Sequence, residues 1–248
     1  MIEKFIHLES NKSVYSDTKN TFDTRFILNE PLKKMKKITL KSMELPITFT
    51  NIRYGVNDTL IFIVNNTAYS IVILEKNYTT IYDILDALNL QLQPFNGTTM
   101  QFMVNSKNQV YVYFTGTVIT SFSIVETKLS RFILGFRSSD TLTTISSTSS
   151  YIASCRYSMS MDTFITIFIS NLEHNNSHNN GSTFKLSFQS EYGQMFFYNE
   201  NTTYTQFICD FNKNQVCNDL RVKILDRFGN QLVSNIDYSM TLFVEMDK

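Results

Sequence analysis

Hydrophobic and polar side chains alternate near the C-terminal end of this chain. In YSMTLFVEM, residues 238–246, every even-numbered position is apolar and most odd-numbered ones are polar. A period of two places the apolar side chains on one face of a strand. A similar run, RVKIL at 221–225, precedes it, and Asp226, Gly229 and Asn230 lie between the two. Because Gly and Asn tolerate positive φ values, the pattern predicts a strand, a turn and a closing strand.

Similar runs of strand-forming residues recur from one end of the chain to the other. Two of them, TLIFIV at 59–64 and AYSIVIL at 68–74, are apolar on both faces, and the NNT between them is typical of a hairpin. Another run ends at Pro46, because proline has no amide hydrogen for a ladder. Strands are predicted at 22–28, 37–46, 59–64, 68–74, 100–104, 110–114, 121–125, 163–169, 183–188 and 193–198.

Only two stretches have the spacing of a helix. Between residues 80 and 92 the apolar side chains recur at helical intervals, Thr80 is a suitable N-cap, and Asp83 lies in the first turn. The segment KLSRFILGF, at 128–136, favours one or two helical turns before Gly135. Many short strands with little helix indicate an all-β fold, an antiparallel sandwich or barrel.

Composition narrows the class of protein. The 248 residues include 22 Lys plus Arg and 22 Asp plus Glu, and this balance argues against a general nucleic-acid coat. Cys155, Cys209 and Cys217 form no CxxC pair, and an odd number of loosely spaced cysteines favours free thiols in a reducing compartment. The start of the chain has no apolar segment typical of a secretory signal, and no apolar run reaches the roughly 20 residues of a membrane span.

Residues with catalytic or metal-binding chemistry are few. His174 and His178 lie in an Asn-rich loop without neighbours that could complete a metal site, and we interpret them as solvated. Spacing alone allows a glycosidase-like carboxylate pair, because its two partners can be distant in sequence. The candidate carboxylates, which we interpret as surface groups, are Glu44, Glu75, Asp83, Asp86, Glu126 and Glu191. We expect no enzyme activity, no cofactor, no metal and no small-molecule substrate.

One run of positive charge occurs in the sequence, KKMKK, with Lys33, Lys34, Lys36 and Lys37, and Lys41 extends it. Two interpretations remain open. The lysines can lie on an exposed turn and strand edge, where they prevent sheet-to-sheet pairing. Alternatively they form a patch that faces the nucleic acid of a genome or an anionic membrane.

Four motifs follow one another along the chain. ITLKSMELPITFTNI, at 38–52, contains Leu40, Ser42, Leu45, Pro46, Asn51 and Ile52, and YTTIYDILDALN contains the expected helix. RFILGF contains Leu134, Gly135 and Phe136, and the C-terminal segment contains Asp226, Gly229, Asp237, Tyr238, Ser239 and Leu242. Together these motifs resemble the small jelly-roll capsid proteins, pentons and minor capsid proteins, of virophages, polinton-like viruses and large eukaryotic DNA viruses.

This resemblance implies a fold and a role. The expected fold is all-β, a single jelly-roll sandwich of two antiparallel sheets with one short helix. We expect an N-terminal arm at 1–21 and one jelly-roll domain at 22–248, with a possible loop insertion around 137–182. The role implied is that of a structural virion protein, a penton that forms a homopentamer beside major and minor capsid proteins, in a capsid assembled in the host cytoplasm.

Other functions remain open at this point. The chain can instead be a minor or cement capsid protein, or a jelly-roll binding module such as a spike or fibre head. The absence of Trp argues mildly against sugar binding, for which aromatic platforms are usual, although Tyr can replace Trp. An enzyme on a β-sandwich is the third class. The position of the protein in a virus particle would distinguish these alternatives.

Overall fold

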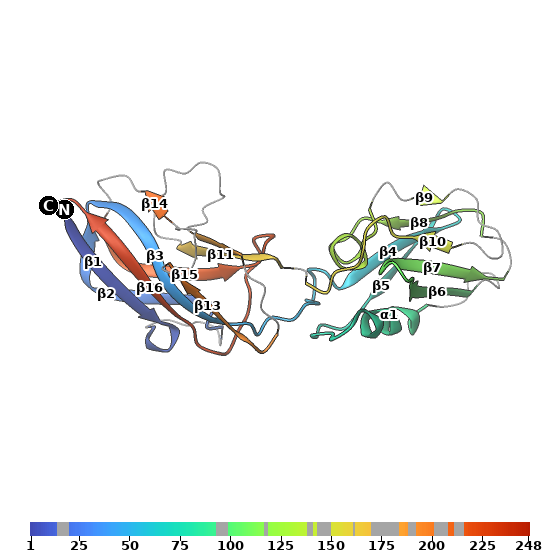
Figure 1. Cartoon of the computed structure of the whole chain (residues 1–248), viewed down its shortest axis with the longest axis horizontal. Coiled ribbons are helices and arrows are strands. Elements are labelled where there is room, and N and C mark those ends of the chain that lie inside the picture. The colour runs from blue at the N-terminus through green and yellow to red at the C-terminus, as the bar shows by residue number, and fades with distance from the viewer. Residues whose placement is uncertain are drawn as a thin grey trace. The chain divides into compact units, whose positions relative to one another are not determined.

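The computed structural model describes residues 1–13, 20–92, 99–116, 119–137, 141–142, 150–160, 162–169, 184–187, 192–200, 208–210 and 216–248. The chain forms two compact units. One is discontinuous and consists of Met1–Phe49 and Asp162–Lys248. The other, Thr50–Met161, lies between these segments in the sequence, and we call it the inserted unit (Figure 1).

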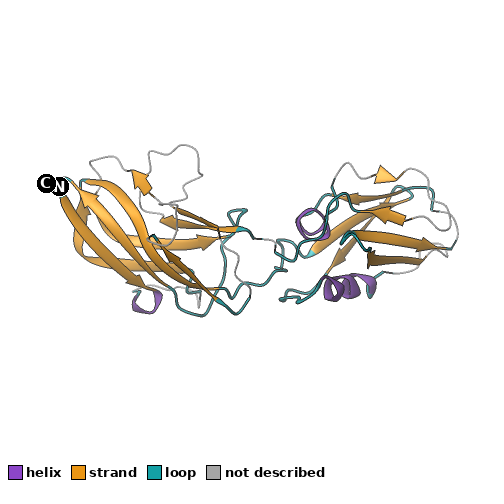
Figure 2. Ribbon diagram, in the orientation of Figure 1, coloured by secondary structure: helices purple, strands orange, loops and turns teal. Residues whose placement is uncertain are grey.

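The discontinuous unit contains two antiparallel sheets (Figure 2). The first, called here the β16 sheet, has the order β1 (Ile2–Glu9), β16 (Ser239–Met246), β3 (Met35–Pro46) and β13 (Met195–Asn199), and β14 (Ile208–Asp210) also pairs with β3. The second, called the β15 sheet, has the order β12 (Phe184–Ser187), β11 (Phe164–Ile169), β15 (Val216–Leu225) and β2 (Asp23–Lys33). A short 3₁₀ turn, η1 (Ser10–Lys12), follows β1.

The order of these strands is that of a jelly roll. Apart from β14, the described strands of this unit are, in chain order, β1, β2, β3, β11, β12, β13, β15 and β16. The β16 sheet holds the first, eighth, third and sixth of them, and the β15 sheet holds the fifth, fourth, seventh and second. This is the eight-stranded jelly-roll topology, in which Greek-key connections place the last strand beside the first. We call this unit the jelly-roll unit.

The two sheets of the jelly-roll unit pack their apolar faces together. The alternating pattern of β16 places Met240, Leu242 and Val244 in this core, and β15 contributes Val222 and Ile224 from the opposite sheet; all five are fully buried. Each such side chain stabilises the fold by about 1.5–3 kcal/mol. Because β1 pairs with β16 along its whole length, the two ends of the chain lie side by side (Figure 1).

The inserted unit has two smaller antiparallel sheets, with the orders β5–β4–β8–β9 and β10–β7–β6. Their strands are β4 (Thr59–Val64), β5 (Thr67–Val72), β6 (Thr99–Val104), β7 (Val110–Thr115), β8 (Phe122–Val125), β9 (Thr141–Leu142) and β10 (Ser150–Ile152). The helix α1 (Ile81–Asn89) begins with a capping box of Thr80 and Asp83. It lies beside β6, where the Asn89 side chain donates to the carbonyl and accepts from the amide of Phe102.

Aromatic rings fill part of the core of the inserted unit. The Phe122 ring lies 4.9 Å from that of Phe114 and 5.1 Å from that of Tyr151, and both pairs meet edge to face. Phe136 stacks on Tyr151 at 5.4 Å. Such pairs contribute about 0.5–1.5 kcal/mol beyond the area that they bury. The inserted unit therefore has an apolar core of its own.

The structure confirms the all-β class, the jelly-roll topology and the presence of one short α-helix in the part of the chain that it describes. Each expected strand between 22 and 198 begins within two residues of its predicted position. The helix predicted at 80–92 is α1, and the turns predicted at 128–136 form η2 (Leu129–Leu134), a π-helical segment. The closing strand of the opening pattern is β16.

The division of the chain differs from the expected one. Residues 1–21, expected as an arm, contain β1, which forms an edge of the β16 sheet. The insertion into the jelly roll is Thr50–Met161, not a loop around 137–182. The Asn-rich loop that contains His174 and His178 lies outside the described residues. Hydrophobic alternation identifies strands, but it does not say which strand neighbours which, so the boundary between two β units is not visible in the pattern.

Candidate assembly surfaces

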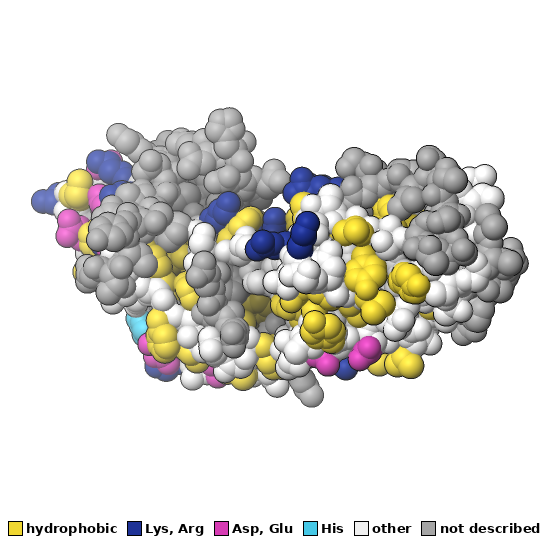
Figure 3. Space-filling model, turned by 45° about the vertical axis from the view of Figure 1, so that its right-hand side comes forward, with side chains coloured by type: hydrophobic (Ala, Val, Ile, Leu, Met, Phe, Trp, Pro, Cys, Tyr) yellow, Lys and Arg dark blue, Asp and Glu magenta, His cyan; other side chains and the backbone are white. Residues whose placement is uncertain are grey.

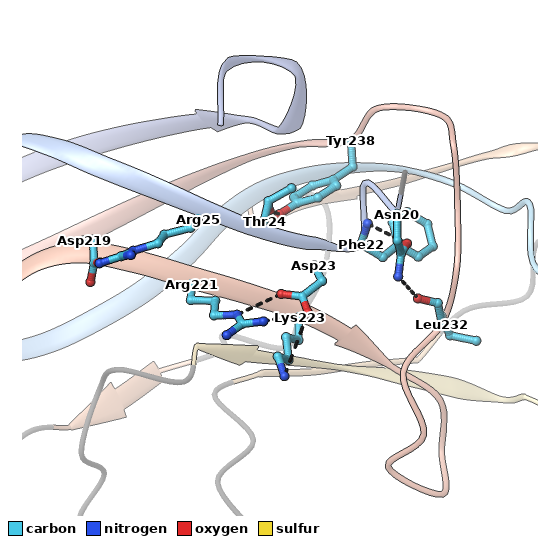
Figure 4. Close-up of polar contacts among 10 residues, drawn as sticks. All are labelled: Asn20, Phe22, Asp23, Thr24, Arg25, Asp219, Arg221, Lys223, Leu232 and Tyr238. Atoms are coloured by element: carbon cyan, nitrogen blue, oxygen red, sulfur yellow. Dashed lines mark hydrogen bonds and ion pairs between the residues drawn. The ribbon is translucent and has the colours of Figure 1, made fainter. Parts of the chain in front are cut away.

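Tyr238 connects the two sheets of the jelly-roll unit at the start of β16. Its ring is buried, and its hydroxyl lies 2.6 Å from that of Thr24 on β2 (Figure 4). Its amide donates to Ser10 Oγ and its carbonyl accepts from the Ser10 amide, each at 3.0 Å, while Ser10 Oγ donates to Asp237 at 2.7 Å. Burial raises the pKa of the Tyr238 hydroxyl and keeps it protonated. These bonds fix the start of β16 against β2 and against η1, which directly follows β1.

Asp226 forms the turn that leaves β15. Its buried carboxylate accepts the amide hydrogens of Phe228 and Asn230, both at 2.8 Å. Gly229 has a φ of 83°, a left-handed conformation that favours glycine. The Asp-x-x-Gly motif is therefore a turn stabilised by the aspartate side chain.

Three motif residues have a place in the core or at a strand end. Leu40 of β3 and Leu242 of β16 are paired across the β16 sheet and are fully buried, and Pro46 is the last residue of β3. Asn51 belongs to the inserted unit, where its amide group donates to the Tyr78 carbonyl at 2.8 Å and accepts from the Tyr78 amide at 2.9 Å. Asn51 thus holds two loops of that unit together.

The LGF motif ends the η2 segment. Gly135 has a φ of 85° and its amide donates to the Ser130 carbonyl, as in a left-handed helix cap. A Cβ at this position would lie 2.4 Å from the carbonyl oxygen of Cys155. Leu134 and Phe136 are buried on either side. Asn51 and this motif lie in the inserted unit, whereas Leu40, Pro46, Asp226, Gly229, Asp237, Tyr238 and Leu242 lie in the jelly-roll unit.

The lysine run lies at the turn between β2 and β3. Lys33 and Lys34 are exposed, and the Lys34 ammonium donates to the backbone carbonyl of Lys248 at 2.7 Å. Further lysines pair with carboxylates: Lys36–Asp247 at 2.5 Å, Lys37–Glu245 at 3.2 Å and Lys41–Glu200. Lys33 is the last residue of β2, an edge strand of the β15 sheet, whereas Lys36, Lys37 and Lys41 lie on β3, an interior strand, and do not protect a sheet edge. Carboxylates at and after the end of β16 therefore neutralise part of the positive charge of the lysine run.

The outer face of the β15 sheet is charged. Arg221 donates two hydrogen bonds to Asp23, at 2.9 and 3.0 Å, and Arg25 pairs with Asp219 (Figure 4). Burial alone would raise the pKa of Asp23, but the hydrogen bonds and charge of Arg221, with the charge of Lys223, outweigh it and lower the pKa. Exposed pairs of this kind contribute about 0.2–1 kcal/mol each.

The outer face of the β16 sheet is more apolar. The Phe5 ring lies 5.0 Å from that of Phe243, and the Lys41 ammonium lies 5.0 Å from the centre of the Phe243 ring. Phe5 is 66% exposed. At the other end of the same sheet, Phe197 of β13 is 67% exposed. Large apolar side chains that stay exposed on a folded protein often mark a contact surface.

The inserted unit also exposes large apolar side chains. In Figure 3, hydrophobic side chains gather on the face of this unit that is turned toward the viewer. Leu74 after β5 and Leu90 after α1 are both at least 80% exposed, and Tyr82 projects from α1. The Gln91 side chain donates to the carbonyl of Val72, which brings the ends of β5 and α1 together.

The candidates for chemistry do not assemble into a site within the described residues. No group of three or more His, Cys, Asp and Glu there could hold a metal ion. His174, His178 and Glu191 lie outside the described residues, and the remaining candidate carboxylates are exposed, namely Glu44, Glu75, Asp83, Asp86 and Glu126. In the described part, none of the helices is long and apolar enough to span a membrane.

These features define an all-β protein of the jelly-roll class with a second β unit inserted between β3 and β11. No family model and no curated protein matches the chain. Among solved structures, the crystal structure of the mavirus penton protein is similar, with a TM-score of 0.49 and 10% identity, over 98% of this chain and 100% of that one. The cryo-EM structure of the Sputnik virophage is also similar, with a TM-score of 0.43 and 10% identity, over 98% of each chain.

Proposed function

We propose that this protein is a structural protein of the capsid of an icosahedral dsDNA virus, and that it occupies the five-fold vertices as a homopentamer. The observation that carries the proposal is the strand order of the jelly-roll unit, an architecture typical of viral capsid proteins. Its neighbours are then the major and minor capsid proteins, and it is assembled into the virion in the host cytoplasm.

The motif residues of the jelly-roll unit support this proposal because they have structural roles in that fold. Tyr238 anchors β16 between the sheets, and Leu242 fills the core below it. Asp226 and Gly229 begin the connector that leads from β15 in one sheet to β16 in the other. Sequence similarity at such positions is expected between proteins that share a jelly-roll ancestor.

In this proposal, the lysine run is a candidate surface for contact with the genome or a membrane on the inner side of the capsid. Lys33 and Lys34 are exposed, whereas Lys36 and Lys37 pair with carboxylates of the C-terminal segment. An external phosphate would have to compete with these carboxylates. We therefore expect any such contact to be weak and to disappear as salt is raised, because ionic contacts with phosphates are screened.

The test is the position of this chain in virus particles. Cryo-EM with icosahedral averaging is expected to place five copies around each five-fold axis, because a ring of five is the closed arrangement that this axis allows. Density for the chain only at two-fold or three-fold positions would reject the penton and favour a minor capsid protein. Its absence from purified particles would reject a capsid role altogether.

A further inference from the structure

A groove runs along one lateral edge of the jelly-roll unit. β1 is the last strand of the β16 sheet and β2 is the last strand of the β15 sheet, and the groove lies between them with a volume of about 500 Å³. The Lys4 ammonium on β1 pairs across the groove with the Glu30 carboxylate on β2, at 3.0 Å. Phe5 and Ile27 line the groove and are 66% and 59% exposed. This edge, called here the groove edge, therefore combines exposed apolar side chains with the outer edges of two strands, neither of which pairs there with another described strand.

The opposite edge of the same unit also ends in apolar side chains. There the last strands are β13 in the β16 sheet and β12 in the β15 sheet. Phe197 and Met195 of β13 are 67% and 42% exposed. Unpaired strand edges with exposed apolar side chains promote association with other chains, and soluble proteins usually protect them. We call this the β13 edge.

We propose that the groove edge binds the β13 edge of a second copy of this chain, so that jelly-roll units join head to tail. This inference rests on the proposed function, because a closed ring of identical subunits needs two different surfaces on opposite sides of each subunit. The strand order provides such a pair of surfaces.

Charge and size also fit a second copy as the occupant. The charged residues that line the groove are Lys4, Lys12, Glu9 and Glu30, together with His7. With two carboxylates for two ammonium groups, the groove does not repel a chain whose own net charge is zero. Thirteen residues of β1, η1 and β2 line the groove, about half of the roughly 20–30 residues per partner in stable interfaces, so the contact would extend from the groove onto the adjoining outer faces of the two sheets.

Lysine substitutions at the two edges test the contact on the full chain. Ile27→Lys changes the groove edge and Phe197→Lys the β13 edge. Each new lysine stands opposite a carboxylate in the strand register, Asp219 and Glu44 respectively, so the fold should be retained. Val233→Lys is the matched control, since Val233 is also 67% exposed but lies in the connector between β15 and β16.

Sedimentation velocity over protein concentrations up to about 100 µM measures the self-association. We expect the unchanged chain and Val233→Lys to associate alike, and both edge variants to associate about tenfold or more weakly, because a charged lysine would replace an apolar side chain in the contact and would have to be desolvated there. A chain that stays monomeric at the highest concentration would overturn the inference. So would association that is equal in all four proteins.

Mixing the two edge variants gives the sharper readout. Ile27→Lys keeps an intact β13 edge and Phe197→Lys keeps an intact groove edge, so each pair can form one unaltered contact. We expect the mixture to form species of two chains with the affinity of the unchanged contact and no larger species. Failure to pair on mixing would overturn the inference. A pentamer at the vertex whose contacts avoid these edges would also overturn this inference, but it would leave the penton proposal intact. A different position of the chain in the particle would reject the penton proposal alone.

Discussion

The two units of this protein are held together by contacts of very different range along the chain. In the jelly-roll unit, Ile2 pairs with Met246, and β2 pairs with β15 across almost the whole sequence. In the inserted unit, Val64 and Thr67 close a hairpin between β4 and β5, with Asn65 and Asn66 both at positive φ, as two-residue hairpin turns require. β6 and β7 form a second hairpin, which is closed by Val104 and Val110 through a longer loop with Asn108 at positive φ.

This difference has a physical consequence. Local pairings need little loop closure, so they form early and depend on few other parts of the chain. Pairings between the two ends form only when the whole unit is assembled. We therefore expect the inserted unit to fold independently of the chain ends, and the jelly-roll unit to require both of them.

Removal of residues 236–248 should have the largest effect. It deletes β16 from the centre of its sheet, together with the buried Tyr238, Met240, Leu242 and Val244. At about 1.5–3 kcal/mol each, these losses are comparable with the whole stability of a domain, about 5–15 kcal/mol. Hydrogen exchange should show the jelly-roll unit unprotected and the inserted unit still protected. If the truncated protein remains soluble with both units protected, β16 is peripheral and the account of the C-terminal strand is wrong.

Leucine-to-alanine substitutions compare the two units more finely. Leu242 lies in the core of the jelly-roll unit and Leu88 in that of the inserted unit, and both are fully buried. Each substitution should destabilise its own unit by about 2–5 kcal/mol. Thermal unfolding, monitored by hydrogen exchange, should show two transitions. Each variant should lower the midpoint temperature of only one of them. A common transition lowered by both would mean that the units unfold together.

Two glycines with nearly equal φ values separate backbone strain from crowding. Gly135 and Gly229 have φ values of 85° and 83°, but a Cβ would meet the Cys155 carbonyl only at Gly135, while at Gly229 nothing lies within 4 Å. Gly229→Ala should cost about 1–2 kcal/mol of unfolding free energy from its backbone conformation. Gly135→Ala should cost a further 1–3 kcal/mol or so from overpacking. Equal losses in denaturant unfolding would contradict the close approach at Gly135.

The smallest expected effect concerns the ion pair on the β15 sheet. The pKa of Asp23 is lowered from 3.8, so its ionised form stabilises the fold at neutral pH, and this contribution is lost as pH falls below 3.8 through the folded value. Arg221→Ala should destabilise the protein by about 0.2–1 kcal/mol at neutral pH. The difference from the unchanged protein should shrink in acid. Lys107→Ala, at an exposed position of the inserted unit, is the control, and a difference independent of pH would reject the pairing.

Residues with local structural roles could be predicted from the sequence. The Asp226–Gly229 turn and the capping box at Thr80 depend on neighbours within a few residues, and both are present in the structure. Most strands were predictable for the same reason, since alternation is a local property. β1 was missed, although Ile6 and Leu8 alternate with His7 and Glu9 in it and could have indicated a strand.

The sequence by itself determined the class of fold, because a period of two along many short runs can be satisfied only by strands. Only the tertiary structure decided which strands are neighbours, since one apolar face can pack equally well against many others. Thr24 and Ser10 became partners of Tyr238, and Glu245 a partner of Lys37, only through pairings between the two ends of the chain. The groove edge exists for the same reason, because β1 and β2 meet only when both sheets are complete.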